Sequence, residues 1–277
     1  HPNKAGAEKM ATVWFEALKK VLASSETVFS PDIVRYKTLE NGDSLALHIF
    51  KPRNMQAGEK RPVIVYFFGG GWKLGTPLQF YRECAYYASK GMVVVSVDYR
   101  IEYLHHSTPF DSFEDAKDAI CWLRSHASDY QLDPDKIAVA GGSAGGHLAA
   151  ALGTIGSDEA VNYRPNLSVL YYPVVDMVSR GYGFPEIKRD FEKISPIHHV
   201  SEATPSTLIL LGTKDPIVSV ETIRSYQDKL LQKGVDCELH LFEGAGHPIF
   251  LYRKPLTEDY YKVRKLTDDF LKREGFL

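Results

Sequence analysis

Short apolar runs alternate with longer amphipathic stretches along most of the chain. The apolar runs are PVIVYFF, MVVVSVDY, KIAVAG, LSVLYYPV, TLILLG and CELHLFEG, and apolar positions at helical spacing lie between them, for example over residues 113–125. Strands that alternate with helices are typical of βαβ units, and continuous apolar character is expected where helices cover both faces of a sheet. The pattern therefore predicts an α/β fold with six interior strands in a mostly parallel sheet.

The first 50 residues follow a different pattern. Apolar side chains at helical spacing in residues 5–23 predict an amphipathic helix, which defines an N-terminal helical segment over residues 1–30. Two β-rich runs then flank Asn41-Gly42, a pair that favours the positive φ values of a tight hairpin turn. We therefore expect an antiparallel hairpin at the start of the sheet.

Length and composition favour one domain over residues 1–277. With 277 residues and 44% hydrophobic residues, the chain can bury a single substantial core, and it contains no internal repeat or low-complexity linker. Residues 176–200 are the longest stretch without a clear strand or long helix. We interpret this stretch as a short cap insertion over whatever site the sheet presents.

The charge balance limits the partners. Lys plus Arg total 33 and Asp plus Glu total 35, so a formal charge of −2 provides no basic surface for nucleic acid or an anionic membrane. No apolar stretch approaches the roughly 20 residues that span a bilayer. The chain opens HPNKAG without Met, which is compatible with the mature form of a periplasmic or secreted protein. The sequence contains no indication of an oligomeric state.

A nucleophile motif lies between a predicted strand and a predicted helix. The segment KIAVAGGSAGGH contains G-x-S-x-G centred on Ser143, and this motif requires a strand-to-helix turn. Glycines beside the serine would prevent collisions in such a sharp turn. His147 follows one helical turn later, and we interpret it as a packing residue. The alternative for Ser143 is a simple helix cap in a Gly-rich turn.

A serine nucleophile needs an imidazole base and a carboxylate that orients the base. Asp215 and His247 each follow a predicted strand, and loops at the carboxyl ends of parallel strands open on one edge of the sheet. The order Ser143, Asp215, His247 is the order of an α/β-hydrolase triad. Asp176 also follows a strand and is the alternative partner for the histidine.

Three consecutive glycines, Gly69 to Gly71, directly follow the strand VIVYFF. Backbone N–H groups that face the developing oxyanion lower the barrier to ester cleavage by about 3–4 kcal/mol each. The N–H group after the nucleophile, on Ala144, would be one donor, and the glycine loop would supply the others. The alternative is a flexible glycine turn without a role in the reaction.

Together these motifs resemble those of the α/β-hydrolase esterases. The resemblance runs from about residue 32 to residue 270 through FFGGGW, VDYR, GGSAGGH, SPIHHV, LLGTKD and GAGH. Within that fold it is strongest for the bacterial acetyl, carbohydrate and feruloyl esterases related to hormone-sensitive lipase. It implies an α/β-hydrolase fold with an antiparallel N-terminal hairpin, and a reaction through an acyl-enzyme that uses no metal or organic cofactor.

The resemblance also implies individual roles. These are Ser143 as nucleophile, His247 as base, Asp215 as acid, and Gly70, Gly71 and Ala144 as oxyanion donors. The chain departs from the family at Phe68, where a histidine usually precedes the glycines. Because that histidine is thought to brace the loop, we expect activity to survive the change.

The expected substrates are short-chain esters, above all acetyl esters of carbohydrates such as acetylated xylan. A cap of about 25 residues leaves little room for a long acyl chain, and Trp72, Tyr182 or Phe184 could stack on a sugar or aromatic ring. Packing is the alternative role for these three aromatics. Feruloyl esterase or general short-chain carboxylesterase activity is the alternative function. A binding protein of the same fold without catalysis is the alternative from another class.

Overall fold

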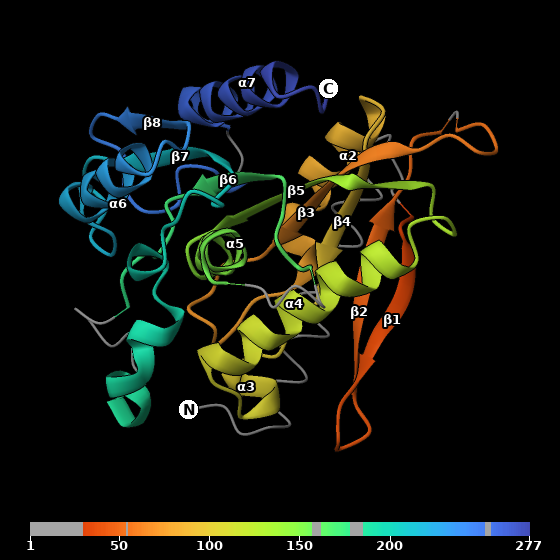
Figure 1. The fold of residues 1–277 in the computed structure, drawn as a ribbon, viewed down its shortest axis with the longest axis horizontal. Helices are drawn as coiled ribbons and strands as arrows, with labels where there is room; N and C mark the ends of the chain where they lie inside the picture. Colours follow the sequence, from red (N-terminus) through yellow and green to blue (C-terminus); the bar gives the residue numbers. More distant parts are fainter. Residues whose placement is uncertain (1–29, 54, 157–161, 178–184, 253–255) are drawn as a thin grey trace. The chain divides into compact units, whose positions relative to one another are not determined.

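The predicted apolar runs form six strands of an eight-stranded sheet in the computed structural model (Figure 1). The structure describes residues 30–53, 55–156, 162–177, 185–252 and 256–277, without the side chains of 185–189. The strands are β1 (Asp32–Thr38), β2 (Ser44–Phe50), β3 (Arg61–Phe67), β4 (Val93–Val97), β5 (Leu132–Gly142), β6 (Leu167–Tyr171), β7 (Ser206–Gly212) and β8 (Cys237–Phe242).

The strand order is β1-β2-β4-β3-β5-β6-β7-β8. Strand β2 pairs antiparallel with both β1 and β4, and all other neighbours are parallel. The mostly parallel sheet and the antiparallel N-terminal hairpin are therefore confirmed. One of the six apolar runs forms an edge strand instead of an interior strand, because β8 pairs only with β7 in the described sheet and its central residues are partly exposed.

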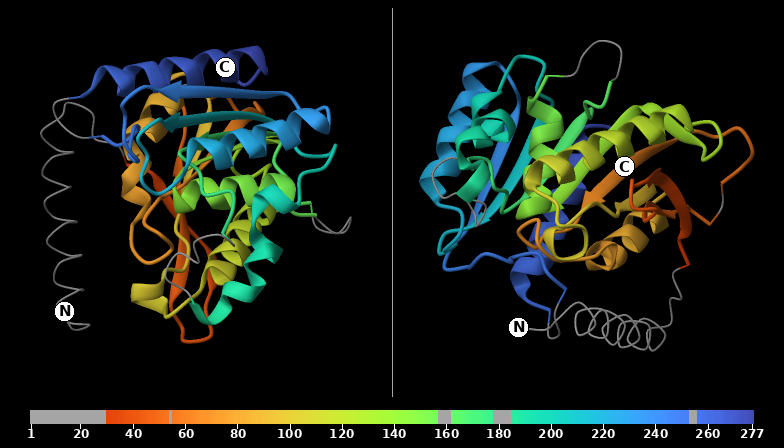
Figure 2. Two further views of the ribbon diagram at one scale, coloured as in Figure 1. Left: turned by 90° about the vertical axis from the view of Figure 1, so that its left-hand side faces the viewer. Right: turned by 90° about the horizontal axis from the view of Figure 1, so that it is seen from below.

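Helices cover both faces of this sheet. They are α2 (Tyr81–Ser89), α3 (Glu102–His105), α4 (Pro109–Ser125), α5 (Ala144–Thr154), α6 (Val220–Gln232) and α7 (Glu258–Arg273), with 3-10 turns η1 (Pro77–Phe80), η2 (Pro185–Ile194) and η3 (Pro196–His198). Helices α2 and α7 lie on one face, and α4, α5 and α6 lie on the other (Figures 1 and 2).

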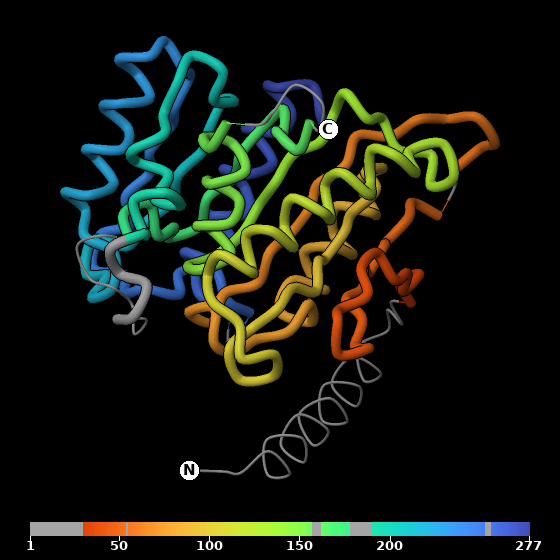
Figure 3. Tube along the Cα trace, turned by 60° about the horizontal axis from the view of Figure 1, so that its bottom comes forward, coloured from red at the N-terminus to blue at the C-terminus, as the bar shows by residue number. Residues whose placement is uncertain are grey.

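The parallel strands end level with one another. In the register, Phe67 at the end of β3 lies beside Gly141 of β5, and Gly212 at the end of β7 lies beside Phe242 of β8. The tube in Figure 3 follows the sheet from the hairpin in red and orange to the last strands in blue. Because the carboxyl ends are in register, the loops after β3, β5, β7 and β8 emerge at one edge of the sheet.

Two local details differ from the predictions. Only Gly42 of the Asn41-Gly42 pair has a positive φ, +86°, and the hairpin closes through a longer loop in which the Leu39 N–H donates to the Asp43 carbonyl at 2.8 Å. Helix α4 begins at Pro109, before the predicted residue 113, because the Thr108 and Asp111 side chains form a capping box.

The predicted cap contains the short 3-10 turns η2 and η3 in its described part. Ser195 between them is fully buried, accepts a hydrogen bond from the Met177 N–H at 3.0 Å and donates one to the Phe191 carbonyl at 2.8 Å. The rest of the cap includes residues 178–184, which lie outside the described residues.

Residues 32–277 form one compact unit. The predicted N-terminal helix lies in residues 1–29, outside the described residues, so the single domain over residues 1–277 stays a prediction. No helix within the described ranges is both long and apolar enough to cross a membrane.

Candidate active site

The backbone of Ser143 adopts a sharp turn between β5 and α5. Its φ of +56° and ψ of −118° are strained for a residue with a side chain, and such strain is concentrated at functional sites. The Ser143 N–H donates to the Tyr171 carbonyl at 3.0 Å, and its carbonyl accepts from the His147 N–H at 2.9 Å. The turn therefore fixes the serine at the N-terminus of α5, where the helix dipole favours negative charge.

The glycines around the serine permit close packing of this turn. A side chain on Gly145 would place its Cβ 2.0 Å from the Phe67 carbonyl oxygen, and one on Gly141 would lie 2.3 Å from the Gly145 oxygen. Neither distance is compatible with a side chain. The predicted reason for these glycines is confirmed, and the packing places the start of α5 directly against the end of β3.

The structure brings Ser143, His247 and Asp215 into one hydrogen-bonded chain. The Ser143 Oγ lies 2.8 Å from the His247 Nε2, and the His247 Nδ1 lies 2.7 Å from the Asp215 Oδ2. With a proton on Nδ1, the histidine donates to the carboxylate and accepts the serine proton. This arrangement is the one that activates a serine hydroxyl.

The Asp215 carboxylate is fully buried and fixed by the backbone. Its other oxygen, Oδ1, accepts hydrogen bonds from the N–H groups of Ile217 and Val218 at 2.8 and 2.9 Å. The His247 side chain is 13% exposed. Asp215, and not the alternative Asp176, is thus the carboxylate that contacts the Nδ1 atom of the histidine.

The candidate oxyanion donors come from two loops. Among the residues that the structure describes, no protein group accepts a hydrogen bond from the N–H groups of Gly70, Gly71 and Ala144. The Gly69 N–H differs, because it donates to the Gln79 Oε1 at 2.6 Å. These three N–H groups, which the sequence predicts as donors, are therefore available to a ligand, and that of Gly69 is not.

The predicted packing role of His147 fits the structure. The side chain is fully buried, its Nε2 donates to the Ile194 carbonyl at 2.7 Å, and burial lowers its pKa to about 4. Its ring meets the Trp72 ring edge-on, with 5.1 Å between centroids. His147 therefore connects α5 to the described end of the cap and to the loop after β3.

Burial also bears on the predicted substrate-binding aromatics. Trp72 is 1% exposed, so its indole faces are covered by the protein, which favours the packing alternative for this residue. Tyr182 and Phe184 lie outside the described residues, and their contact with substrate stays a prediction.

Sequence reasoning missed Tyr172, which follows β6. Its φ of +38° is unusual for a bulky residue, it is 4% exposed, and its ring lies 4.8 Å from the His247 ring. It also occupies the space that a side chain on Gly142 would need, with the Tyr172 hydroxyl 2.7 Å from that Cβ position. The sequence contains no signal for these contacts with His247 and Gly142, since a tyrosine after a strand is common.

The described part of the chain contains no cluster of three or more His, Cys, Asp or Glu residues suited to a metal ion. The prediction that the reaction uses no metal or organic cofactor stays a prediction.

Comparison with known proteins gives consistent matches. Residues 47–186 match the family model BD-FAE. The structure matches that of a thermophilic esterase from Thermogutta terrifontis bound to propionate, with 37% identity, a TM-score of 0.83, and coverage of 90% of this chain and 96% of that one.

Two curated relatives are also esterases. Esterase LipC from Mycobacterium tuberculosis is 30% identical over 233 residues, which cover 73% of this chain and 56% of LipC. An acetylxylan esterase from Xylanibacter ruminicola is 25% identical over 212 residues, which cover 69% of this chain and 42% of that protein. The chain spans about half the length of these curated relatives.

Proposed function

The chain belongs to the BD-FAE family of α/β-hydrolase serine esterases, and from that premise we propose that it hydrolyses carboxylic esters through an acyl-enzyme on Ser143. The observation that carries the proposal is the continuous hydrogen-bonded chain from the Ser143 Oγ through His247 to Asp215. The free N–H groups beside it supply the second requirement of ester cleavage, a site for the oxyanion.

In the first half of the reaction, the His247 Nε2 takes the proton of Ser143 while Oγ bonds to the ester carbonyl carbon. The carbonyl oxygen becomes an oxyanion that accepts hydrogen bonds from Gly70, Gly71 and Ala144. When this intermediate collapses, the bond to the alcohol breaks and the protonated histidine gives its proton to the leaving oxygen.

In the second half, water replaces the alcohol. His247 takes a proton from the water as its oxygen bonds to the acyl carbon, and a second oxyanion forms in the same place. Collapse of that intermediate breaks the bond to Ser143, the serine recovers its proton, and the acid leaves. Asp215 holds the histidine in the correct tautomer throughout both halves.

We further propose short acyl groups as the substrate class, with acetylated carbohydrates as the first choice. The relative from Xylanibacter ruminicola is named an acetylxylan esterase, and structures of the Thermogutta terrifontis esterase contain propionate or butyrate. Feruloyl esters and simple short-chain esters are the alternatives, and these relatives do not separate them from acetyl esters.

A series of p-nitrophenyl esters from acetate to decanoate tests both parts of this proposal. Each methylene that enters an apolar pocket contributes about 0.8 kcal/mol, so a long acyl tunnel would make kcat/KM rise steadily with chain length. We expect a maximum at two to four carbons. A maximum at eight carbons or more would refute the short-acyl class, and no hydrolysis of any ester by a folded chain would refute the esterase.

Acetylated and feruloylated xylo-oligosaccharides then separate the two carbohydrate classes. The proposal expects release of acetate at a higher kcat/KM than release of ferulate. The reverse order would favour the feruloyl alternative.

A further inference from the structure

The loop after β3 is fixed from behind by a tyrosine of the VDYR motif. The Tyr99 hydroxyl donates to the Phe68 carbonyl oxygen at 2.6 Å, and the two rings stack with 4.0 Å between centroids and 13° between planes. Both side chains are fully buried. Phe68 is the first residue of the glycine loop, by which we mean residues 68–75, so this contact fixes the point from which the loop departs.

Further contacts fix the next two residues of the glycine loop. The Gln79 Oε1 accepts from the Gly69 N–H at 2.6 Å, and the Gly70 carbonyl accepts from the N–H groups of Lys73 and Leu74 at 3.2 Å. A side chain on Gly75 would collide with the Phe68 ring at 2.5 Å, so the loop closes tightly over that ring. The N–H groups of Gly70 and Gly71 stay available in this arrangement.

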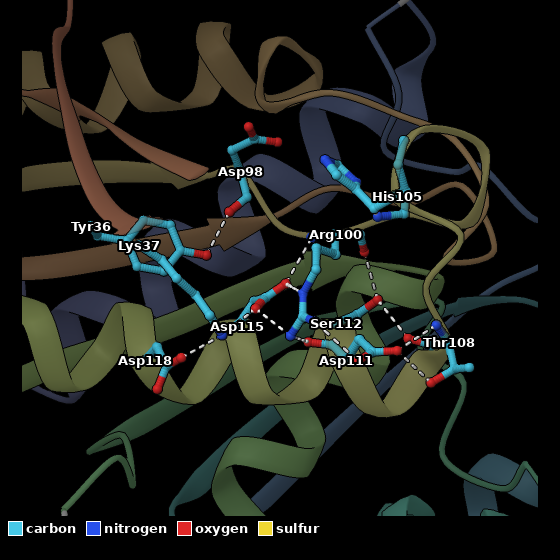
Figure 4. Close-up of polar contacts among 11 residues, drawn as sticks. Tyr36, Lys37, Asp98, Arg100, His105, Thr108, Asp111, Ser112, Asp115 and Asp118 are labelled. Carbon is cyan, nitrogen blue, oxygen red and sulfur yellow. Dashed lines mark hydrogen bonds and ion pairs between the residues drawn. The ribbon is translucent and has the colours of Figure 1, made fainter. Parts of the chain in front are cut away.

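The two chain neighbours of Tyr99, Asp98 and Arg100, are themselves held by hydrogen bonds (Figure 4). The Asp98 carbonyl accepts from the Tyr36 hydroxyl at 2.8 Å, and the Arg100 N–H donates to the Asp115 Oδ2 at 2.9 Å. The Arg100 guanidinium binds both oxygens of the same carboxylate, each at 2.8 Å. A two-point pair of this kind fixes direction as well as distance.

The carboxylate that anchors Arg100 belongs to the scaffold. Asp115 lies on α4, its side chain is fully buried, and it also binds the Lys37 Nζ from β1 at 2.6 Å. Ser112 of the same helix donates to the Arg100 carbonyl at 2.8 Å. The segment that carries Tyr99 is therefore attached to a long helix and to the hairpin, and neither of these contributes a residue to the triad.

We propose that Tyr99 is a positioning residue for the oxyanion hole. Through its hydrogen bond to the Phe68 carbonyl, Tyr99 connects the glycine loop to the Arg100–Asp115 ion pair and so holds the N–H groups of Gly70 and Gly71 in place. The inference rests on the proposed esterase function and adds to it the group that aligns its backbone donors. Tyr99 touches neither Ser143 nor His247 in the described contacts, so its effect on the reaction passes through the loop.

Such a role has a distinct kinetic signature. The oxyanion is fully formed only in the transition state, so misaligned donors lower kcat and leave substrate binding nearly unchanged. Removal of a complete donor costs about 10²- to 10³-fold in kcat. A donor that is displaced but present should cost less, on the order of tenfold.

The test compares Tyr99→Phe with Tyr163→Phe. The first substitution removes only the hydroxyl and preserves the ring stack. The second is a matched control, because the hydroxyl of the buried residue Tyr163 also donates to a backbone carbonyl, that of Gly156, beyond the far end of α5. The measurements are kcat and KM for p-nitrophenyl acetate, hydrogen–deuterium exchange of the peptide that covers residues 69–75, and thermal unfolding.

We expect Tyr99→Phe to lower kcat about tenfold with KM within twofold of the wild type, and to accelerate exchange in residues 69–75. Tyr163→Phe should leave kcat, KM and the exchange of residues 69–75 unchanged, even if it lowers the unfolding temperature as much as Tyr99→Phe does. A Tyr99→Phe protein with kcat within twofold of wild type, an equal loss in the control, or a loss that lies in KM would each overturn the inference.

Fluorophosphonate labelling of the wild-type chain distinguishes a failure of the positioning role from a failure of the proposed esterase function. If Ser143 is labelled and esters are hydrolysed while Tyr99→Phe behaves as wild type, the positioning role alone fails. If the folded wild-type chain is neither labelled nor active, the proposed function fails and the inference fails with it.

Discussion

On the side of the site that moves protons, three side chains from the loops after β5, β7 and β8 contact one another directly, at 2.8 and 2.7 Å. On the side that would bind the oxyanion, the candidate donors are backbone N–H groups, and the side chains nearby bind the loop instead of the reacting atoms. We call these the proton-transfer side and the oxyanion side.

The difference shows where residue identity matters. On the proton-transfer side the chemistry belongs to the side chains, so a substitution removes a reacting group. On the oxyanion side any residue except proline could offer an N–H group, and identity matters otherwise only through the backbone shape that glycine permits and the contacts that fix it. The first side should therefore respond to substitution abruptly, and the second in proportion to how far the loop moves.

The largest effect is expected for Ser143→Ala. Loss of the nucleophile removes the covalent step, and we expect kcat for p-nitrophenyl acetate to fall by about 10⁴- to 10⁶-fold with the fold intact. Residual activity is measured with enough enzyme to detect the lowest rate, alongside circular dichroism. Activity within tenfold of the wild type would remove Ser143 from the proton-transfer side.

Asp215→Asn should follow closely. An amide at this position favours the wrong tautomer of His247, and we expect a loss of about 10⁴-fold in kcat. Asp176→Asn is the matched control, since it changes the alternative carboxylate by the same few atoms, and it should cost less than tenfold. The opposite ranking of the two kcat values would transfer the acid role to Asp176.

On the oxyanion side, Gly70→Ala should lower kcat by about 10²-fold or more. The new Cβ would lie 1.9 Å from the Leu74 carbonyl oxygen at a φ of +144°, so the loop must move away from its present shape. Gly91→Ala, at φ +101° with no atom closer than 3.9 Å, introduces a strained residue without a collision. Equal kcat losses in the two variants would mean that backbone strain alone, and not donor placement, explains the effect.

The smallest effect concerns Asp98, the residue before Tyr99. Burial, and secondarily the charge of Asp115, raises the pKa of Asp98 from 3.8 to about 7. The folded chain therefore binds a proton that the unfolded chain releases between these values, and the stabilising contribution present below pH 4 is lost as the pH rises through 7.

Asp98→Asn removes this dependence. The variant should match the wild type below pH 4 and exceed its unfolding temperature by a few degrees at pH 8. The measurement is thermal unfolding of both proteins across this range, so that titration of all other groups cancels in the difference. A variant that is less stable than the wild type at pH 8 would show that the Asp98 charge stabilises the anchor.

The proton-transfer side could be predicted from the sequence because each of its residues follows an apolar run that is typical of a strand. Once those runs are parallel neighbours, Ser143, Asp215 and His247 must meet at one edge. Only the choice between Asp215 and Asp176 required the three-dimensional structure. The sheet was predictable for the same reason, apart from the position of β8. The central residues of this strand are partly exposed, but its sequence contains enough apolar residues to resemble an interior strand.

The oxyanion side could be predicted only in part. The three glycines indicate a loop whose backbone a substrate can approach closely. The contact between Tyr99 and Phe68, by contrast, joins residues 31 positions apart in the sequence. It exists because β4 lies beside β3, a strand order that no local pattern encodes. Likewise, nothing in the sequence around Gln79 indicates that its side chain accepts a hydrogen bond from the Gly69 N–H.

The most direct test of Ser143 as the nucleophile is the site of covalent modification. The wild-type chain is incubated with a fluorophosphonate, the number of labels is read from the intact mass, and the labelled peptide is identified by fragmentation. We predict one label per chain, on Ser143, and none in Ser143→Ala. A folded wild-type chain that takes no label, or an active one labelled at another residue, would contradict the assignment of Ser143 as the activated nucleophile.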